Sequence, residues 1–104
     1  MMTKQDIFSS LRENQLVLEK FGVSRCGLFG SFRTGEATER SDVDLLVIFD
    51  PEQKTFNNFM DLCFFLEELF GRKVDVVTPE SLSPHFGHKI LQEVEYVSFS
   101  RVNS

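Results

Sequence analysis

The chain has 104 residues, of which 41% are hydrophobic and 26% are charged, and its formal net charge is −5. This length predicts one globular domain over residues 1–104 with a modest core. The acidic balance and scattered basic residues disfavour direct binding of nucleic acid. No segment approaches the roughly 20 apolar residues of a membrane-spanning helix, and Met1 begins no signal-peptide pattern. We therefore expect a cytoplasmic protein without a membrane partner.

The first half of the chain predicts a helix followed by two strands. Apolar residues at helical spacing indicate a helix over about 4–20, with Thr3 or Asp6 near its start. Apolar and β-branched runs then predict strands over about 23–29 and 42–49. A polar connection that contains a glycine separates the two strands, as expected of a surface loop.

The second half repeats the alternation of helix and strand. A helix is predicted over about 55–70, with Gly71 as its stop signal, and a strand over about 73–78. A further helix over 86–95 and a short strand over 96–99 follow. Together these elements predict an α/β (α+β) fold in which helices flank a small mixed sheet.

The helix over 55–70 offers two faces for packing. Its predicted core face consists of apolar residues at steps of three and four, namely Phe56, Phe59, Cys63, Leu66 and Phe70. Phe65 projects onto an acidic side instead, and Leu16 lies opposite the apolar face of the first helix. Exposed apolar residues of this kind suggest contact with a partner protein. A core packed around more of the helix is the alternative for Phe65.

The cysteines and histidines do not form a recognisable metal pattern. Cys26 and Cys63 stand far apart without a C-x-x-C pair, so we expect reduced thiols packed as small hydrophobic residues. His85 and His88 are separated by two positions and lack a nearby acidic pattern. We expect them at the surface or at the rim of a substrate site.

Asp42 and Asp44 stand at the start of the second predicted strand. Because side chains alternate along a strand, both carboxylates are expected on one face, with Cα atoms about 6.6 Å apart. Carboxylates at this separation can converge on Mg²⁺, and paired ions can clamp the oxygens of an in-line phosphoryl displacement. Taken alone, the same pair also fits a solvent-exposed strand entrance.

Gly30 and Ser31 end the first predicted strand, where the chain is expected to turn into a short helix. Free N–H groups at a helix start attract phosphate oxygens, and glycine lets a ligand approach the backbone closely. The Ser31 hydroxyl adds a donor. A tight turn would explain Gly30 alone, so the functional interpretation depends on its combination with Asp42 and Asp44.

Asp75 is the single acid in the β-branched run over 73–78. Alternation places it on the face opposite Val74 and Val76, and burial of an acid is costly unless it meets a cation or a donor. Two metal ions need more negative charge than two aspartates supply, and an attacking hydroxyl needs a proton acceptor. Asp75 is therefore the candidate third acid, with a water-facing edge-strand residue as the alternative.

The segment over 30–47 reads G-S-F-R-T-G-E-A-T-E-R-S-D-V-D-L-L-V. It resembles the signature of the polymerase-beta-like nucleotidyltransferase superfamily, and is most similar to the minimal nucleotidyltransferase (MNT) branch. Members of this branch are small bacterial and archaeal proteins that often act as antitoxins to HEPN-domain ribonucleases. Gly30, Ser31, Asp42 and Asp44 fall on the motif positions. In the family an Ala-Arg pair is common where this chain has Arg33 and Thr34.

The resemblance implies a polymerase-beta-like nucleotidyltransferase fold and a magnesium-dependent enzyme with ATP as substrate. One or two Mg²⁺ ions would be held by the catalytic acids Asp42, Asp44 and Asp75. Gly30 and Ser31 would bind the nucleotide, and whether Arg33 takes over from the displaced arginine stays open. The implied reaction transfers AMP to a hydroxyl, that of a tyrosine, on a HEPN-domain toxin that would form a hetero-oligomer with this chain.

Two other functions remain open at this level. A binding antitoxin could keep the fold, lose most of its catalysis and neutralise its toxin by occlusion. A small-molecule nucleotidyltransferase is the third alternative, although the sequence shows no extra domain that would shape a pocket for a small acceptor. Composition does not select adenine over other bases, so the choice of ATP rests on the resemblance alone.

Overall fold

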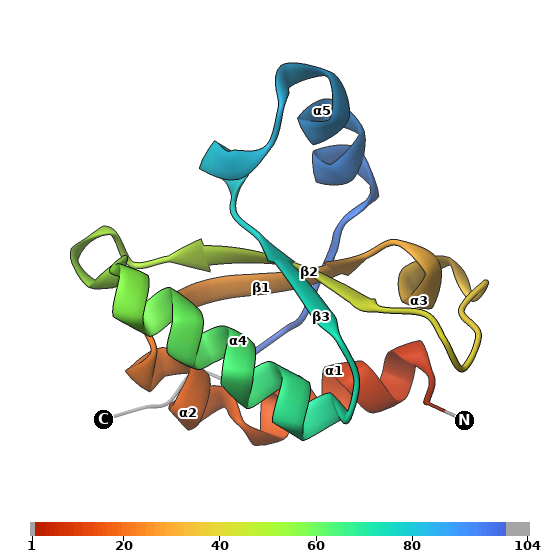
Figure 1. Ribbon diagram of the computed structural model, residues 1–104, viewed down its shortest axis with the longest axis horizontal. Helices are drawn as coiled ribbons and strands as arrows, with labels where there is room; N and C mark the ends of the chain where they lie inside the picture. The colour runs from red at the N-terminus through yellow and green to blue at the C-terminus, as the bar shows by residue number, and fades with distance from the viewer. Residues whose placement is uncertain (1, 100–104) are drawn as a thin grey trace.

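The computed structural model of the protein describes residues 2–99, which form a four-stranded sheet with helices on both faces (Figure 1). The elements follow in the order α1 (Lys4–Glu13), α2 (Gln15–Lys20), β1 (Val23–Phe29), α3 (Ser31–Thr34), β2 (Val43–Phe49), η1 (Pro51–Gln53), α4 (Phe56–Phe70), β3 (Val74–Val77), η2 (Pro79–Ser81), α5 (Pro84–Glu93) and β4 (Glu95–Tyr96). The predicted mixed α/β fold is confirmed.

The strands lie in the order β3-β2-β1-β4. β1 pairs antiparallel with β2 and with β4, whereas β2 and β3 are parallel. A parallel pair needs a long crossover, and α4 supplies it. The parallel register sets Asp44 directly opposite Asp75, and the antiparallel register sets Asp44 opposite Phe29. The topology thus brings the end of β1 and both acids to one place.

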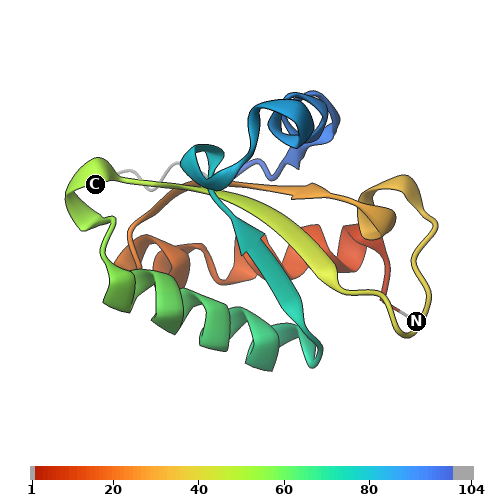
Figure 2. The same cartoon turned by 45° about the horizontal axis from the view of Figure 1, so that its top comes forward.

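The two faces of the sheet are covered unequally. Helices α1, α2 and α4 lie along one face, and α5 projects from the other (Figures 1 and 2). Alternate residues of β2, namely Val43, Leu45, Val47 and Phe49, join the buried core under α1, α2 and α4. Leu46 is fully buried but lies outside this core cluster, on the α5 side. Asp44 shares that second face by alternation.

The predicted start of the first helix and the predicted stop of α4 are confirmed. Thr3 caps α1 in a reciprocal arrangement with Asp6, in which the Asp6 N–H donates to Thr3 Oγ1 at 3.2 Å and the Thr3 N–H donates to Asp6 Oδ2 at 2.9 Å. Thr55 caps α4 through its side chain. Gly71 ends α4 in the left-handed conformation, with φ of 65°.

The continuous first helix predicted over 4–20 is wrong, because the chain breaks at Asn14 into α1 and α2. Asn14 has φ of −106° and ψ of 21°, and its Nδ2 donates to the Ser10 carbonyl at 2.8 Å. An asparagine side chain competes with the backbone for such carbonyls, which favours an end of the helix at this position.

Two predictions for α4 are also wrong. Phe56, predicted to lie in the core, is 76% exposed at the first residue of the helix. Phe65, predicted to be exposed, is half-buried and stacks against Phe21 with ring centroids 5.7 Å apart. The segment that follows α2 covers this side of α4, so the alternative of a wider core holds for Phe65.

The C-terminal elements begin earlier than predicted. Ser83 caps α5 by accepting from the Phe86 N–H at 3.3 Å, and Pro84 takes the first helical position, where its missing N–H is harmless. The helix therefore starts two residues before the predicted 86. The last strand covers Glu95–Tyr96 instead of 96–99.

Cys26 is buried as predicted, whereas Cys63 is only half-buried. The predicted exposure of the two histidines and of Leu16 is confirmed, and the partner contact suggested for Leu16 stays a prediction. Cys26 and Cys63 are both free, and burial raises the pKa of the Cys26 thiol from 9.0 to about 12. His85 and His88 are exposed, and Leu16 is 62% exposed.

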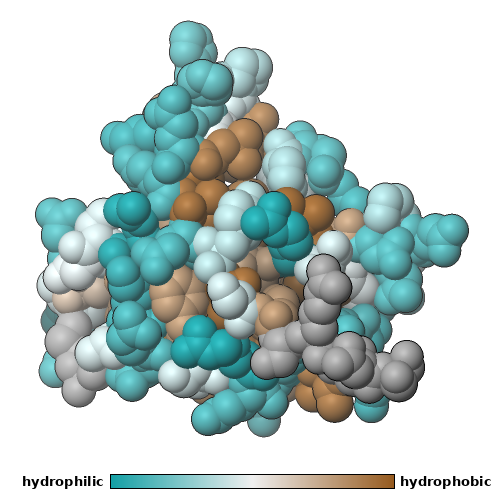
Figure 3. Space-filling model, turned by 180° about the vertical axis from the view of Figure 1, so that it is seen from behind, coloured by the Kyte–Doolittle hydropathy of each residue, from teal (hydrophilic) through white to brown (hydrophobic). Residues whose placement is uncertain are grey.

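Seen from behind, the molecule is largely hydrophilic, with hydrophobic groups gathered below the projecting α5 (Figure 3). Within residues 2–99 none of the helices has the length and apolar character needed to cross a membrane.

Candidate functional site

The three predicted acids lie at one end of the β2–β3 pair. Asp44 and Asp75 face each other across the parallel strands, on the face opposite the main core. Asp42 directly precedes β2 and is therefore a loop residue, not a strand residue as predicted. All three acids are half-buried. The fold therefore brings together acids that lie more than 30 positions apart in the chain.

The electrostatics of Asp44 show that these acids act on one another. The pKa of Asp44 is raised from 3.8 to about 6, chiefly because burial disfavours its charged form. The charges of Asp75 and then Asp42 raise it further, as does a hydrogen bond with the Asp75 side chain. Such a concentration of negative charge creates a strong local preference for a cation.

Lys73 is the cation that approaches this cluster in the described part of the chain. Its Nζ lies 3.7 Å from Asp75 Oδ1 and 4.0 Å from Asp42 Oδ2, and its side chain is 66% exposed. The sequence prediction did not include it. The alternation that assigned Asp75 to one face of β3 places Lys73, two positions earlier, on the same side and could have identified it.

The acids suit a hard metal ion by their chemistry, but they are not arranged as a ready-made site. Among residues 2–99 no three His, Cys, Asp or Glu side chains already converge as ligands for one ion. The donors are carboxylate oxygens, which Mg²⁺ prefers, and the raised pKa of Asp44 reflects negative charge in need of compensation. The three carboxylates therefore suit Mg²⁺ by their chemistry, and their side chains would have to change conformation to bind one ion together.

Replacement of Lys73 by methionine should tighten binding of Mn²⁺ to the nucleotide-free protein. The substitution removes a positive charge about 4 Å from two carboxylates, which is worth about 1 kcal/mol in a solvated setting, or roughly fivefold in affinity. Isothermal titration calorimetry measures the change. Lys20, exposed in the last turn of α2, provides the control as Lys20→Met and should leave the affinity unaltered. Unchanged or weaker binding by Lys73→Met would contradict this reading of the cluster.

Gly30 lies against the Asp44 side chain, at the turn between β1 and α3. Its φ of 75° and ψ of −156° belong to a region that is essentially restricted to glycine. A Cβ at this position would overlap the Asp44 carboxylate. The Gly30 carbonyl accepts from the N–H groups of Arg33 at 3.1 Å and Thr34 at 3.2 Å, which starts the short helix α3 at Ser31. The structure thus brings the predicted turn and Asp44 into direct proximity.

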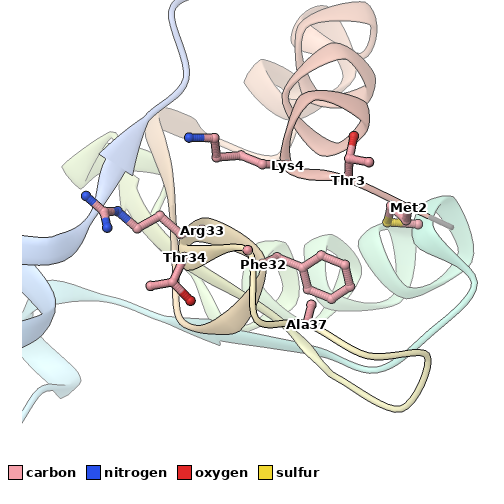
Figure 4. Close-up of a pocket in the computed structure, with 8 residues that line it drawn as sticks. Met2, Thr3, Lys4, Phe32, Arg33, Thr34 and Ala37 are labelled. Atoms are coloured by element: carbon pink, nitrogen blue, oxygen red, sulfur yellow. The ribbon is translucent and has the colours of Figure 1, made fainter.

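Arg33 leaves α3 on the side opposite Phe32 (Figure 4). Phe32 is buried in the core, whereas the Arg33 side chain extends towards the ribbon of the C-terminal segment. Arg33 Nε is buried without a hydrogen-bond partner, which leaves this guanidinium only partly satisfied. Both residues line a cavity of about 380 Å³ that adjoins α1 and α3 and does not include the three acids.

Comparison with known proteins identifies the fold and the motif together. The sequence model of the family described as the nucleotidyltransferase domain matches residues 13–97. Protein adenylyltransferase MntA of Thermococcus cleftensis is 43% identical over 98 residues, which cover 93% of this chain and 98% of the relative. A relative from Methanocaldococcus jannaschii, provisionally named a protein adenylyltransferase, is 36% identical over 100 residues, covering 93% of this chain and all of the relative.

Solved structures agree with this assignment. A structure provisionally described as a minimal nucleotidyltransferase superposes with a TM-score of 0.78 at 33% identity, covering 90% of this chain and 95% of the other. A chain from the crystal structure of a toxin-antitoxin with AMP-PNP shares the fold with a TM-score of 0.66 at 20% identity, covering 96% of this chain and 76% of the other. The protein therefore belongs to the nucleotidyltransferase domain family, as a minimal nucleotidyltransferase related to MntA.

Proposed function

We propose that this minimal nucleotidyltransferase is the magnesium-dependent antitoxin of a HEPN-domain ribonuclease. In this proposal it transfers AMP from ATP to a hydroxyl of the toxin, that of a tyrosine side chain, and thereby silences it. The chain would act as one domain over residues 1–104, in the cytoplasm, within a hetero-oligomer with its toxin. Residues Asp42, Asp44 and Asp75 would be its catalytic acids.

One observation carries the proposal: the parallel register that sets Asp44 beside Asp75, with the Gly30 turn against the Asp44 carboxylate. A nucleotidyl transfer site needs a place for a triphosphate next to acids that hold cations. Because Gly30 lacks a side chain, the Asp44 carboxylate can lie against the backbone of the turn, next to the N–H groups at the start of α3. Burial and the neighbouring acids raise the pKa of Asp44 to about 6, and a bound cation would offset its negative charge. These features meet within one corner of the sheet.

Each residue has a distinct task in the proposed reaction. The backbone at Gly30 and the hydroxyl of Ser31 donate hydrogen bonds to the β- and γ-phosphates, and Arg33 offers its partly unsatisfied guanidinium to the same anion. Asp75 either helps to hold an Mg²⁺ ion or accepts the proton of the incoming hydroxyl, and the oxygen of that hydroxyl attacks the α-phosphorus as pyrophosphate leaves. Positioning and charge compensation supply most of the catalysis.

Asp42 and Asp44 would hold the Mg²⁺ ions, with Asp75 as a further ligand in the first of its two roles. When bound, Mg²⁺ neutralises phosphate charge and helps the pyrophosphate depart. Lys73, at 3.7 Å from Asp75 and 4.0 Å from Asp42, compensates part of the same negative charge in the metal-free protein.

The named relatives support both the nucleotide and the partner. The most similar relative described above is named a protein adenylyltransferase, and one structural neighbour is a toxin-antitoxin with AMP-PNP. Another neighbour is a MntA-HepT variant in which a tyrosine is replaced by alanine, and a third carries replacements of two aspartates that stand two positions apart. Asp42 and Asp44 have the same spacing. These likenesses favour a toxin as acceptor and ATP as donor.

A label-transfer experiment tests the proposal. The protein is incubated with Mg²⁺, ATP labelled at the α-phosphate and the product of the neighbouring gene, with Asp44→Ala as the inactive variant. We expect label on a tyrosine of the partner, lost when Mg²⁺ is chelated and in the variant. A tight complex without label, formed equally by both proteins, would instead support neutralisation by occlusion. Label on a small acceptor without any protein partner would support a small-molecule transferase.

A further inference from the structure

Arg72 lies between α4 and β3 and contacts two segments that belong to the candidate site. Its Nη1 donates to the Ser41 carbonyl at 2.9 Å and to the Thr38 carbonyl at 3.5 Å. Its guanidinium carbon lies 4.9 Å from the centroid of the Phe32 ring. The hydrogen bond to Ser41 reaches the residue that precedes Asp42, and the contact with the Phe32 ring reaches the residue that follows Ser31.

The loop that Arg72 contacts is also held at its start, where the Glu36 N–H donates to the Ser31 carbonyl at 2.9 Å and Ala37 packs against the core. Within this loop, Thr38 and Ser41 bond to each other, through Thr38 N–H to Ser41 Oγ at 2.8 Å and Ser41 N–H to the Thr38 carbonyl at 3.1 Å. These bonds shape the turn but do not fix it relative to the sheet. Arg72 belongs to the α4–β3 connection, and its hydrogen bonds to the Thr38 and Ser41 carbonyls join this connection to the α3–β2 loop.

The contacts of Arg72 use the shape of an arginine. A planar guanidinium can stack on an aromatic ring while its edge donates to carbonyl oxygens, which a lysine ammonium cannot do at once. Arg72 Nε is buried and has no hydrogen-bond partner. A side chain that leaves a buried donor unsatisfied is a poor choice for stability alone. The position of Arg72 is better explained by its contacts with two segments, the loop before Asp42 and the helix α3.

We propose that Arg72 is a positioning residue that fixes the loop before Asp42 relative to the helix after Ser31, and thereby sets the affinity for metal-bound nucleotide. This inference rests on the nucleotide site of the proposed function. Arg72 itself touches none of Asp42, Asp44, Asp75, Gly30 or Ser31 by a hydrogen bond or ion pair in the described part of the chain. Its effect passes through the backbone of Ser41 and the ring of Phe32.

Three variants separate positioning from folding. Arg72→Met keeps an apolar stem against Phe32 and removes both hydrogen bonds to the loop. Arg72→Lys retains the charge and N–H donors on one nitrogen, but loses the planar guanidinium that lies over the Phe32 ring. Arg25→Met is the matched control, because Arg25 stacks on Tyr96 at 3.8 Å from the ring centroid, in the same kind of contact, on a part of β1 away from Asp44.

Calorimetric titration with Mn²⁺ and AMP-PNP, thermal unfolding and hydrogen exchange are measured on the full chain. We expect Arg72→Met to weaken nucleotide binding about tenfold or more, the size of effect seen for residues that orient metal ligands, and to speed exchange in residues 36–42. Arg72→Lys should recover part of both losses. Arg25→Met should remain within about twofold of the wild-type affinity.

The outcomes distinguish this inference from the proposed function. Suppose that the wild type binds nucleotide and that Arg72→Met binds it equally tightly, with unchanged hydrogen exchange. That result would overturn the role of Arg72 and leave the proposed function standing. If the wild type binds no nucleotide, the proposed function fails, and the exchange of residues 36–42 still decides whether Arg72 holds the loop. If Arg72→Met does not fold, Arg72→Lys carries the comparison: wild-type affinity and exchange in that variant would overturn the inference.

Discussion

Replacement of Asp44 by asparagine should abolish nucleotidyl transfer and, at the same time, stabilise the metal-free protein at neutral pH. Transfer should fall by at least about 10²–10³-fold, the size of effect found when one charge-stabilising group is lost from an active site. The stability should move in the opposite direction because burial, and then the charges of Asp75 and Asp42, disfavour the charged form of Asp44 in the folded protein. A residue that is optimised for a reaction commonly opposes stability.

The pH dependence of this stabilisation has a defined sign. The pKa of Asp44 is raised from 3.8 to about 6 by folding, so the folded state favours the protonated carboxyl. Its contribution to stability is therefore fully present below about pH 4 and is lost as the pH rises through 6. Asparagine resembles the protonated form at every pH. After allowance for solvent screening, Asp44→Asn should gain about 1 kcal/mol at pH 7.5 and nothing at pH 4.

Chemical denaturation of the metal-free wild type and variant at several pH values measures this difference. Asp61→Asn is a suitable control, since Asp61 is an exposed acid of α4 outside the cluster. It should leave both activity and the pH profile of stability unchanged. A variant that is less stable than the wild type at pH 7.5, or equally more stable at pH 4 and pH 7.5, would contradict the raised pKa of Asp44 in the folded protein.

Gly30→Ala is expected to remove nucleotide binding and to destabilise the protein by about 2–4 kcal/mol. Two effects act together at this position. Alanine disfavours a φ of 75° with ψ of −156°, and its Cβ would overlap the Asp44 carboxylate. The turn can accept the methyl group only if Asp44 or the backbone moves, and either movement disturbs the place proposed for the triphosphate.

Gly35 offers a matched control for this substitution. It has a similarly positive φ of 86°, at the end of α3, but a Cβ there would meet nothing within 4 Å. Gly35→Ala should therefore show only the cost of the left-handed backbone, about 1 kcal/mol, and retain nucleotide binding. Denaturation and titration with AMP-PNP compare the two variants. Equal losses in both would mean that backbone strain, not proximity to Asp44, explains the effect of Gly30→Ala.

Local signals predicted much of this fold from the sequence. Alternation located β2 and β3 and placed Asp75 on the face opposite Val74, and Gly71 marked the end of α4 because few other residues accept a left-handed backbone. The motif from Gly30 to Asp44 predicted the candidate site. These features depend on neighbours in the sequence, which is why the residues alone could reveal them.

Features set by tertiary contact were not predictable in this way. The covering of Phe65 depends on where Phe21 lies after folding, and helical periodicity cannot place one helix on another. The break at Asn14 reflects competition between a side chain and the backbone that a hydrophobic pattern does not register. The contact of Arg72 with the Ser41 carbonyl joins residues 31 positions apart and depends on the pairing of β3 with β2, which no local pattern at Arg72 indicates.

A crystal structure with Mn²⁺ and a non-hydrolysable ATP analogue tests the central claim most directly. The account predicts an anomalous manganese peak within about 2.2 Å of carboxylate oxygens of Asp42 and Asp44, with the triphosphate beside Gly30 and Ser31. Asp75 should face the same ion or the α-phosphate. A triphosphate bound elsewhere, or manganese without contact to Asp42 and Asp44, would contradict the assignment of this corner of the sheet as the transferase site.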